Sequence, residues 1–204
     1  MSTERLNETS NKRVTQGQHT VRQVLAVARK AFAEQGFANT TTQQIIDAAG
    51  ITKGALYHHF PSKADLFEAV YRDIEQAVEA QIAQASASIN RPWDQLLAGC
   101  CAYLDAFQNA DWYRILRIDG PAVLGQQQWA KIDAEHGLER LLPFLEFLAA
   151  NRIIEVASVP AFARLLTGAM NEASFWIASA DNKQAALAAS KATLIAWLEG
   201  VRVT

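Results

Sequence analysis

Apolar residues recur every three or four positions along almost the whole chain, the spacing that places them on one face of an α-helix. Val24, Ala28 and Phe32 show this spacing near the start of the 204-residue sequence. No stretch alternates apolar and polar residues in the manner of a β-strand. The pattern predicts an all-α fold of about nine helices, with caps included at about 20–36, 41–49, 52–59, 62–86, 92–108, 111–119, 126–150, 160–180 and 182–199.

Glycine and proline residues divide these helices. Pro92 suits the first position of a helix. Gly120 and Pro121 are expected to end the short helix before them. Pro143 lies inside the range 126–150, and because proline has no amide hydrogen it is expected to bend that helix.

Residues 41–63, TTQQIIDAAGITKGALYHHFPSK, form the most informative local pattern. Thr41 and Gln44 have the spacing of a capping box, Gly50 supplies the positive φ that ends the first helix, and Thr52 caps the second. Two short helices joined by such a turn form a helix-turn-helix. The second helix of this motif can enter the major groove of DNA while the first crosses the phosphate backbone.

Small, polar and basic residues gather on the outward face of this motif. Lys53 can donate to guanine, and Ala55 can contact a thymine methyl group. Any one of these residues could be an ordinary surface residue, but behind the Gly50 turn they predict a DNA-binding surface together. Its expected members are Thr42, Gln43, Lys53, Gly54, Ala55, Tyr57, His58, His59 and Lys63.

Residues 20–71 resemble the DNA-binding domain of TetR-family transcriptional regulators. The resemblance rests on AFAEQGF (31–37), AGITKGALYHHF (49–60) and PSKADLF (61–67). Ile46 stands where family members usually carry alanine, and Ala55 where they often carry threonine.

The resemblance also implies roles for the predicted DNA-binding residues. Tyr57 and Lys63 would contact phosphates, and Thr42 and Gln43 would touch the DNA backbone or a base edge. The groove readers would be Lys53, Gly54, Ala55 and His58, with His59 on a phosphate or in the packing.

Charge is distributed unevenly along the chain. Residues 1–63 hold eight Lys and Arg against four acids, whereas the remainder holds eleven against seventeen, so a net charge of −2 conceals a basic N-terminal part. Basic charge next to a helix-turn-helix is the electrostatic pattern of a DNA-binding domain. We expect a flexible polar arm over residues 1–18, the DNA-binding domain over 19–65, and a C-terminal ligand-binding and dimerisation domain over 66–204.

The C-terminal part resembles the corresponding domain of one TetR subgroup, through RILRIDGPAVLG (114–125), IDAEHGL (132–138) and LLTGAMNEA (165–173). The family resemblance implies an effector pocket between helices, and the many aromatic residues there favour an apolar cavity. Such a pocket would select bulky, uncharged or aromatic molecules. Its expected lining is Leu97, Cys101, Leu104, Trp112, Leu116, Trp129 and Phe147.

The last two predicted helices are rich in alanine and other small residues, which permit close helix approach. A pair of such helices from each of two subunits would form a four-helix interface, although a plain intramolecular core is an alternative. The expected interface residues are Leu166, Ala169, Met170, Ala173, Ala189 and Ala192.

Other kinds of chemistry find little support in the sequence. The four histidines and two adjacent cysteines lack metal-ligand spacing, and no nucleophile elbow, phosphate-binding loop or dinucleotide fingerprint occurs. We therefore expect no metal, no cofactor and no enzymatic activity. Cys100 and Cys101 are expected to be small core residues, with a redox sensor as the alternative. No apolar run is long enough to span a membrane and no secretory signal is evident, so a cytoplasmic location is expected.

These observations predict a homodimeric TetR-like regulator, most simply a repressor, that leaves a palindromic operator when a small apolar or aromatic effector binds. Two alternatives stay open: an all-α enzyme or ligand carrier, and an architectural DNA-binding protein without a ligand.

Overall fold

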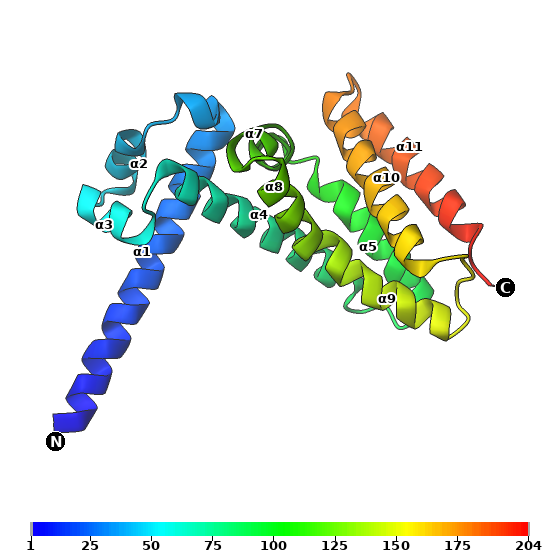
Figure 1. Ribbon diagram of the computed structural model, residues 1–204, viewed down its shortest axis with the longest axis horizontal. Helices are drawn as coiled ribbons and strands as arrows, with labels where there is room; N and C mark the ends of the chain where they lie inside the picture. Colours follow the sequence, from blue (N-terminus) through cyan, green and yellow to red (C-terminus); the bar gives the residue numbers. More distant parts are fainter. Residues whose placement is uncertain (1, 204) are drawn as a thin grey trace. The chain divides into compact units, whose positions relative to one another are not determined.

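The computed structural model describes the backbone of residues 2–203 and the side chains of residues 17–203 (Figure 1). Several consecutive helical segments run into one another, so the described part contains nine helical runs, and the predicted all-α fold is confirmed. The segments are α1 (Ser2–Asn39), α2 (Thr42–Ala49), α3 (Lys53–His59), α4 (Lys63–Ser86), α5 (Pro92–Ala106), α6 (Ala110–Tyr113), η1 (Arg114–Asp119), α7 (Gly120–Leu124), α8 (Gln126–Asp133), η2 (Ala134–Leu138), α9 (Glu139–Ala150), α10 (Val159–Ser179) and α11 (Lys183–Glu199).

The chain forms two compact units, Met1–Asp73 and Ile74–Thr204, and the division falls inside α4. It lies beyond the boundary predicted after residue 65, because the first turns of α4 belong to the core of the N-terminal unit. Phe67 of α4 packs edge-on against Phe32 and Phe37 of α1, with centroid distances of 5.3 Å to each. Leu66, Phe67 and Val70 are fully buried.

The start of α1 differs from the prediction. The flexible arm was expected over residues 1–18. The side chains of residues 1–16, which are most of it, lie outside the described part of the structure. The backbone of α1 begins at Ser2, so the helix start expected at Thr20 is wrong. No proline and only one glycine, Gly17, lie between Ser2 and Thr20, so nothing in the local sequence forces a helix to begin there.

The end of α1 and the turn after α2 follow the prediction. Gly36 has φ 79° and interrupts the helical backbone of α1. Thr41 and Gln44 form the reciprocal capping box, and Gly50 adopts the left-handed conformation with φ 62°. Gly50 donates its amide hydrogen to carbonyl groups of the last turn of α2, which ends the helix and turns the chain toward α3.

The helical run that contains Gly120 and Pro121 is longer than predicted. The chain does not stop at these residues but continues as α7 to Leu124. The preceding segment η1 is a π-helix, in which the Gly120 amide donates to the Ile115 carbonyl five residues earlier. Pro121 then lies at the first positions of α7, where its missing amide hydrogen is not needed.

The helical run around Pro143 contains a second π-helix. Pro143 lies inside α9. The run departs from regular α-helix at η2, residues Ala134–Leu138, one turn and more before the proline. Single π-turns of this kind are frequent at functional sites.

The core of the C-terminal unit comes from α5, α9, α10 and α11. Leu104, Leu145, Leu148, Leu166 and Ile177 are fully buried in one cluster. The α10 helix contacts α5, α9 and α11, and Figure 1 shows α10 and α11 side by side. This packing fixes one face of each helix inward and leaves the other outward.

Candidate functional site

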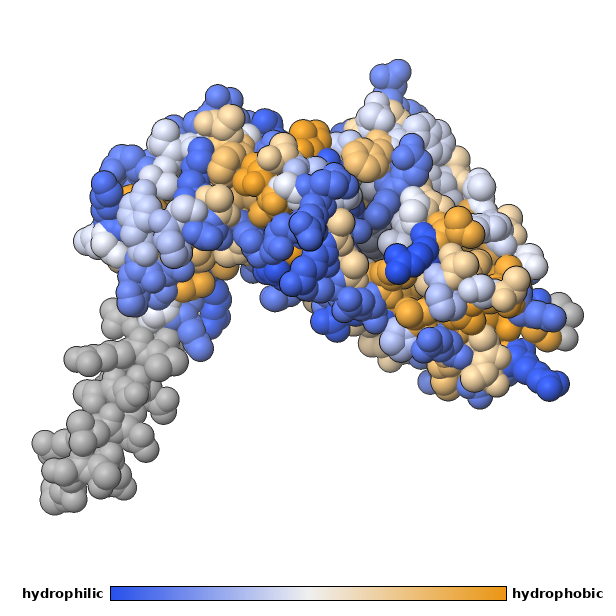
Figure 2. Space-filling view, in the orientation of Figure 1, coloured by the Kyte–Doolittle hydropathy of each residue, from blue (hydrophilic) through white to orange (hydrophobic). Residues whose placement is uncertain are grey.

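The exposed face of α3 carries most of the predicted DNA-binding residues. Thr52 caps α3 through a hydrogen bond from the Ala55 amide, and Leu56 is buried on the inner face. Lys53, Gly54, Tyr57 and His58 are exposed on the outer face. The surface over α2 and α3 is mostly hydrophilic in Figure 2. A short helix held on one side by its core residue thus presents a narrow polar face.

Contacts between α2 and α3 order this polar face. The Tyr57 hydroxyl lies 3.2 Å from Thr42 Oγ1, and Lys53 Nζ lies 6.0 Å from the centre of the Tyr57 ring. Gln43 donates to Asp47 Oδ1 at 2.7 Å. These contacts bring Thr42, Lys53 and Tyr57 together across the turn.

Lys63 is engaged within the protein. Its Nζ donates to the carbonyl oxygens of Phe37 at 2.8 Å and Thr40 at 2.9 Å, and it lies 4.2 Å from the centre of the Phe37 ring. The ammonium group therefore caps the carboxyl end of α1. The sequence prediction assigned it to a phosphate and did not foresee these two acceptors.

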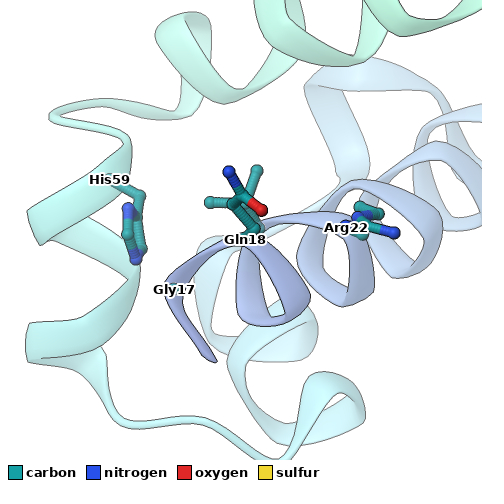
Figure 3. Close-up of a pocket in the computed structure, with 5 residues that line it drawn as sticks. Gly17, Gln18, Arg22 and His59 are labelled. Atoms are coloured by element: carbon teal, nitrogen blue, oxygen red, sulfur yellow. The ribbon is translucent and has the colours of Figure 1, made fainter. Parts of the chain in front are cut away.

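His59 is half-buried, and with α1 it forms a surface depression. Figure 3 shows His59 of α3 facing the stretch of α1 that carries Gly17, Gln18 and Arg22. The His58 and His59 rings meet edge-on at a centroid distance of 5.1 Å. His59 thus lies at the join between α3 and α1, whereas His58 is exposed on the outer face of α3.

The C-terminal unit contains a cavity of about 550 Å³. Its walls come from α4, α5, η1, α8, η2, α9 and α10. Apolar lining residues include Val78, Ile82, Leu96, Leu141, Phe144 and Met170, and polar ones include Glu75, Glu79, Tyr103, Arg117, Asp133, His136, Arg140 and Asn171.

None of the seven residues predicted for the effector pocket lines this cavity. The lining uses Leu96 and Cys100, each one position before the predicted Leu97 and Cys101, and Phe144, one turn before the predicted Phe147. Leu104 and Leu116 are fully buried, Trp112 is half-buried, and Trp129 donates its indole hydrogen to the Leu116 carbonyl at 3.1 Å. Phe147, on α9, is 47 % exposed. The cavity lies among the helices that carry the predicted residues, but it is lined by other faces of those helices.

A buried arginine organises the polar end of the cavity. The Arg117 side chain is 2 % exposed and pairs with Asp133 at 2.7 Å. Its second terminal nitrogen donates to the Tyr103 hydroxyl at 2.5 Å and to Asn171 Oδ1 at 3.0 Å, and Tyr103 donates to the same Asn171 oxygen. This network joins α5, η1, α8 and α10.

The ionisation of this network is fixed by its surroundings. Burial alone would lower the pKa of Arg117, but Tyr103, Asp133 and Glu75 together raise it above its ordinary value. Burial raises the pKa of Tyr103, although Arg117 opposes the change. The guanidinium therefore stays charged and the phenol stays neutral at physiological pH.

A second charged group lies beside the cavity. Glu79 Oε1 lies 2.6 Å from His136 Nδ1 and 2.8 Å from Arg140 Nε. Glu75 and Glu79 lie one turn apart on α4, and His136 belongs to the π-helix η2. The charged lining residues Glu75, Glu79, Arg117, Asp133 and Arg140 were not among the residues predicted for the pocket. A charged residue within an otherwise apolar helix stripe, such as Arg117 in RILRID, is the signal that would have found one of them.

The two cysteines have different surroundings. Cys100 is buried and lines the cavity, and burial, followed by the charge of Cys101, raises its pKa to about 12. Burial also raises the pKa of Cys101, which is less buried and is closer to Lys191 and Asp105. A raised pKa keeps a thiol protonated and unreactive.

The outer face of α10 and α11 is apolar. Leu165 is 65 % exposed, Trp176 51 % and Trp197 40 %. Ala169, Ala189 and Ala192 are exposed on these helices and Ala173 is half-buried. Leu166 and Met170, which were also predicted for the interface, are instead buried in the core of their own chain. They occupy the inner face of α10, whereas Leu165, one position earlier, points to the outer face.

The described residues form neither a metal site nor a membrane-spanning helix. No group of three or more His, Cys, Asp or Glu side chains in the part of the chain that the structure describes is placed to hold a metal ion. Across the same residues, every helix is too short or too polar to cross a membrane.

Two family models match the chain. Residues 24–70 match the bacterial regulatory proteins of the tetR family, and residues 93–201 match the tetracyclin repressor-like C-terminal domain.

Curated relatives match over the N-terminal part. The HTH-type transcriptional repressor KstR2 of Mycolicibacterium smegmatis is 33 % identical over 87 residues, which are 43 % of this chain and 42 % of that protein. The HTH-type transcriptional regulator TtgR of Pseudomonas putida is 37 % identical over 73 residues, 36 % of this chain and 34 % of that protein. The chain thus spans about two fifths or less of the length of these curated relatives.

Solved structures match over almost the whole chain. A TetR-family transcriptional regulator from Pectobacterium atrosepticum is 32 % identical, with a TM-score of 0.78 over 93 % of this chain and 97 % of that one. A structure from Syntrophomonas wolfei is 16 % identical with a TM-score of 0.77 over 92 % of this chain and 98 % of that one, which shows the shared fold alone. Because one family model covers more than half of the chain and a solved relative matches along nearly its full length, the chain belongs to the TetR family of bacterial regulatory proteins.

Proposed function

We propose that this protein is a ligand-responsive transcriptional repressor that binds a palindromic DNA operator as a homodimer. The observation that carries the proposal is the arrangement of α2, Gly50 and α3, in which Lys53, Gly54 and Tyr57 share one exposed face. A helix with a glycine and short side chains at its start can approach base edges closely. Relatives named transcriptional repressors favour repression over activation. Such a protein acts in the bacterial cytoplasm, where it meets DNA.

The proposed DNA contacts divide into two kinds. Lys53, Gly54, Ala55 and His58 would meet base edges, while Thr42, Gln43 and Tyr57 would fix the protein on phosphates. The hydrogen-bond distance between Tyr57 and Thr42 supports a joint role for these two hydroxyl groups at one phosphate. Lys63 keeps one ammonium hydrogen beyond its two carbonyl acceptors, and a phosphate contact would use that hydrogen.

Dimerisation through α10 and α11 is supported by the apolar residues on their outer face. Leu165, Trp176 and Trp197 together expose large apolar side chains beside the small residues Ala169 and Ala189. An isologous contact of this face with its copy would bury those side chains in a four-helix arrangement. We therefore assign the interface to Leu165, Ala169, Trp176, Ala189 and Trp197.

Ligand control would act through α4, which contributes to both units. Its first turns pack in the core of the N-terminal unit, and its later turns line the cavity. Two half-sites must be about 34–36 Å apart, or a multiple of that distance, for both recognition helices to dock. A ligand that favours a different placement of α4 would prevent simultaneous docking. To shift the balance about a hundredfold, it needs about 2.7 kcal/mol of differential affinity for the two states.

The proposal is tested with DNA from the region upstream of the gene, in fluorescence anisotropy across a salt series. We expect the wild-type protein to bind one specific DNA site that contains two half-sites. The Tyr57→Ala variant should bind this site more weakly. The Lys53→Ala variant should lose its base preference at one base pair of each half-site. The matched control is Lys131→Ala, an exposed lysine in the C-terminal unit, which should bind like the wild type. Binding that depends on salt but not on sequence would instead identify an architectural DNA-binding protein.

A further inference from the structure

The charged side chains that line the cavity do not balance one another. The lining contains three carboxylates, those of Glu75, Glu79 and Asp133, and two permanently charged cations, Arg117 and Arg140. The cavity therefore has one carboxylate more than it has permanent cations. The lining expected from the sequence held no charged residue, which is why an uncharged ligand was predicted there.

The two arginines contribute unequally to the charge inside the cavity. The Arg140 side chain is 66 % exposed, so water and salt screen most of its charge. Arg117 is buried, but Asp133 pairs with it at 2.7 Å and the carboxylate of Glu75 also acts on it electrostatically. Two carboxylates outweigh the single guanidinium, so this end of the cavity is negatively charged.

Glu79 adds the third carboxylate. Its Oε1 lies 2.6 Å from His136 Nδ1, and a neutral imidazole with its hydrogen on Nδ1 can make this contact, so no positive charge on His136 is required. The second partner of Glu79 is the exposed Arg140. The contact with Glu79 therefore leaves the cavity negative whenever the imidazole is neutral.

The carboxylates belong to one region and a ligand can reach them. Glu75 and Glu79 lie one turn apart on α4, and Asp133 lies three residues before His136, the partner of Glu79. Glu79 and Asp133 both line the cavity, and about one fifth of each side chain is exposed. A charged ligand group can thus approach both side chains without entering the core.

The rest of the lining suits an apolar body that carries a positive charge. Ile82, Leu96, Leu141 and Phe144 line the cavity from three different helices. The face of an aromatic ring such as that of Phe144 attracts cations. Because the dielectric constant of a partly enclosed site is lower than that of water, the carboxylates attract a cation and repel an anion more strongly there. An uncharged ligand would leave the surplus carboxylate unbalanced.

We propose that the effector is an organic monocation, in which an amine or quaternary ammonium group on an apolar body is held by the carboxylates of the cavity. Its single positive charge matches the single surplus carboxylate of the lining. The inference rests on the proposed function, because it names the ligand class of the same regulatory cavity.

The experiment compares three molecules of nearly the same shape that differ in charge: (2-naphthylmethyl)trimethylammonium, its uncharged carbon isostere 2-neopentylnaphthalene, and 2-naphthylmethanesulfonate. Each is titrated into the full-length protein without DNA, and binding is followed by the change in naphthalene fluorescence. We expect the cation to bind at least about tenfold more tightly than the carbon isostere, and the anion to bind more weakly than either. A carbon isostere that binds as tightly as the cation, or an anion that binds best, overturns the proposal.

Two glutamine variants locate the charge that is responsible. Glu79→Gln removes the surplus carboxylate but keeps the shape of the side chain, so the advantage of the cation over the carbon isostere should fall about tenfold. Glu146→Gln is the matched control, because Glu146 is exposed on α9 and does not line the cavity, and it should keep that advantage. An advantage that Glu79→Gln retains in full would contradict the proposal.

Two further outcomes are separable. If Glu79→Gln fails to fold by circular dichroism, the three wild-type affinities still decide the proposal. Absence of operator binding would instead sink the proposed function and leave these affinities unaffected.

Discussion

Single residues in this protein are placed by specific partners. Lys63 contacts two carbonyl groups at the end of α1, and Arg117 is held by Asp133, Tyr103 and Asn171. In both cases a long cationic side chain ends at acceptors far away in the sequence. Such partners give these residues a structural role in addition to any contact with DNA or ligand.

The first prediction at this scale concerns Lys63. Lys63→Met removes two hydrogen bonds from a charged donor to the end of α1, so the free energy of unfolding should fall by about 1–3 kcal/mol. Urea denaturation followed by circular dichroism measures the change. Lys30→Met is the control, since Lys30 is 76 % exposed and lies 3.9 Å from Glu34, and it should change stability by less than about 0.5 kcal/mol. Equal effects of the two substitutions would contradict the capping role.

The second prediction at this scale concerns the thiols. The pKa of Cys100 is raised to about 12, and a raised pKa lowers the thiolate fraction at every pH below it. At pH 8 on the order of one Cys100 side chain in ten thousand is ionised, and only the thiolate reacts with iodoacetamide. Mass spectrometry should therefore find Cys101 alkylated well before Cys100. Faster labelling of Cys100 would show that the cavity is more open to solvent than the structure indicates.

At the scale of elements, the ends of helices and their irregular turns determine what each helix presents. The αL turn at Gly50 sets the angle between α2 and α3. In the π-helices η1 and η2, backbone hydrogen bonds join residues five positions apart instead of four. Arg117 lies in η1 and His136 lies in η2. An extra residue in a turn rotates every following side chain around the helix axis, so the inward face changes along one continuous run.

A prediction at this scale concerns Gly54 on the recognition helix. A Cβ atom at Gly54 would meet only Thr52 Oγ1, at 4.0 Å, and Gly54 is exposed, so the rest of a leucine side chain can extend into solvent. Glycine in a helix is about 0.5–1 kcal/mol less favourable than alanine, so the variant should be at least as stable as the wild type. Its affinity for the operator should nevertheless fall at least about tenfold, because a leucine side chain would hold α3 away from the bases. Unchanged affinity in the anisotropy assay would place the groove contact on another face.

At the scale of the whole molecule, the proposed regulation requires two copies and one helix shared by two units. The α4 helix begins in one unit and ends in the other. The exposed apolar face of α10 and α11 belongs entirely to the C-terminal unit. The proposed dimer contact and the cavity proposed for the ligand therefore belong to the same unit, and the proposed DNA-binding surface belongs to the other.

A prediction at this scale concerns assembly. Ala169→Arg and Ala189→Arg place a long cation on the outer face of α10 or α11, which should shift sedimentation from dimer toward monomer while the helix content is kept. Ala87→Arg, at an exposed alanine after α4, is the control and should remain dimeric. A sedimentation coefficient unchanged in both interface variants would move the contact away from these helices.

Local sequence alone determined the helix-turn-helix. Thr41, Gln44, Gly50 and Thr52 act on backbone groups within a few residues, so their effects do not depend on distant packing. The helical periodicity predicted the all-α fold for the same reason. The helix break at Gly36 and the first residue of α5 at Pro92 were also confirmed.

Only the tertiary structure decided which face of each C-terminal helix meets the cavity and which meets solvent. Leu96 and Cys100, not Leu97 and Cys101, line the cavity, and Leu165, not Leu166, points outward. Adjacent residues of a helix lie about 100° apart, and in an alanine-rich, apolar helix both neighbours satisfy the sequence pattern equally well. Each π-turn also rotates the residues that follow it around the helix axis, and no feature of the local sequence predicted either π-turn. The inward face was therefore fixed by contacts between α4, α5, α9 and α10, which join residues far apart in the chain.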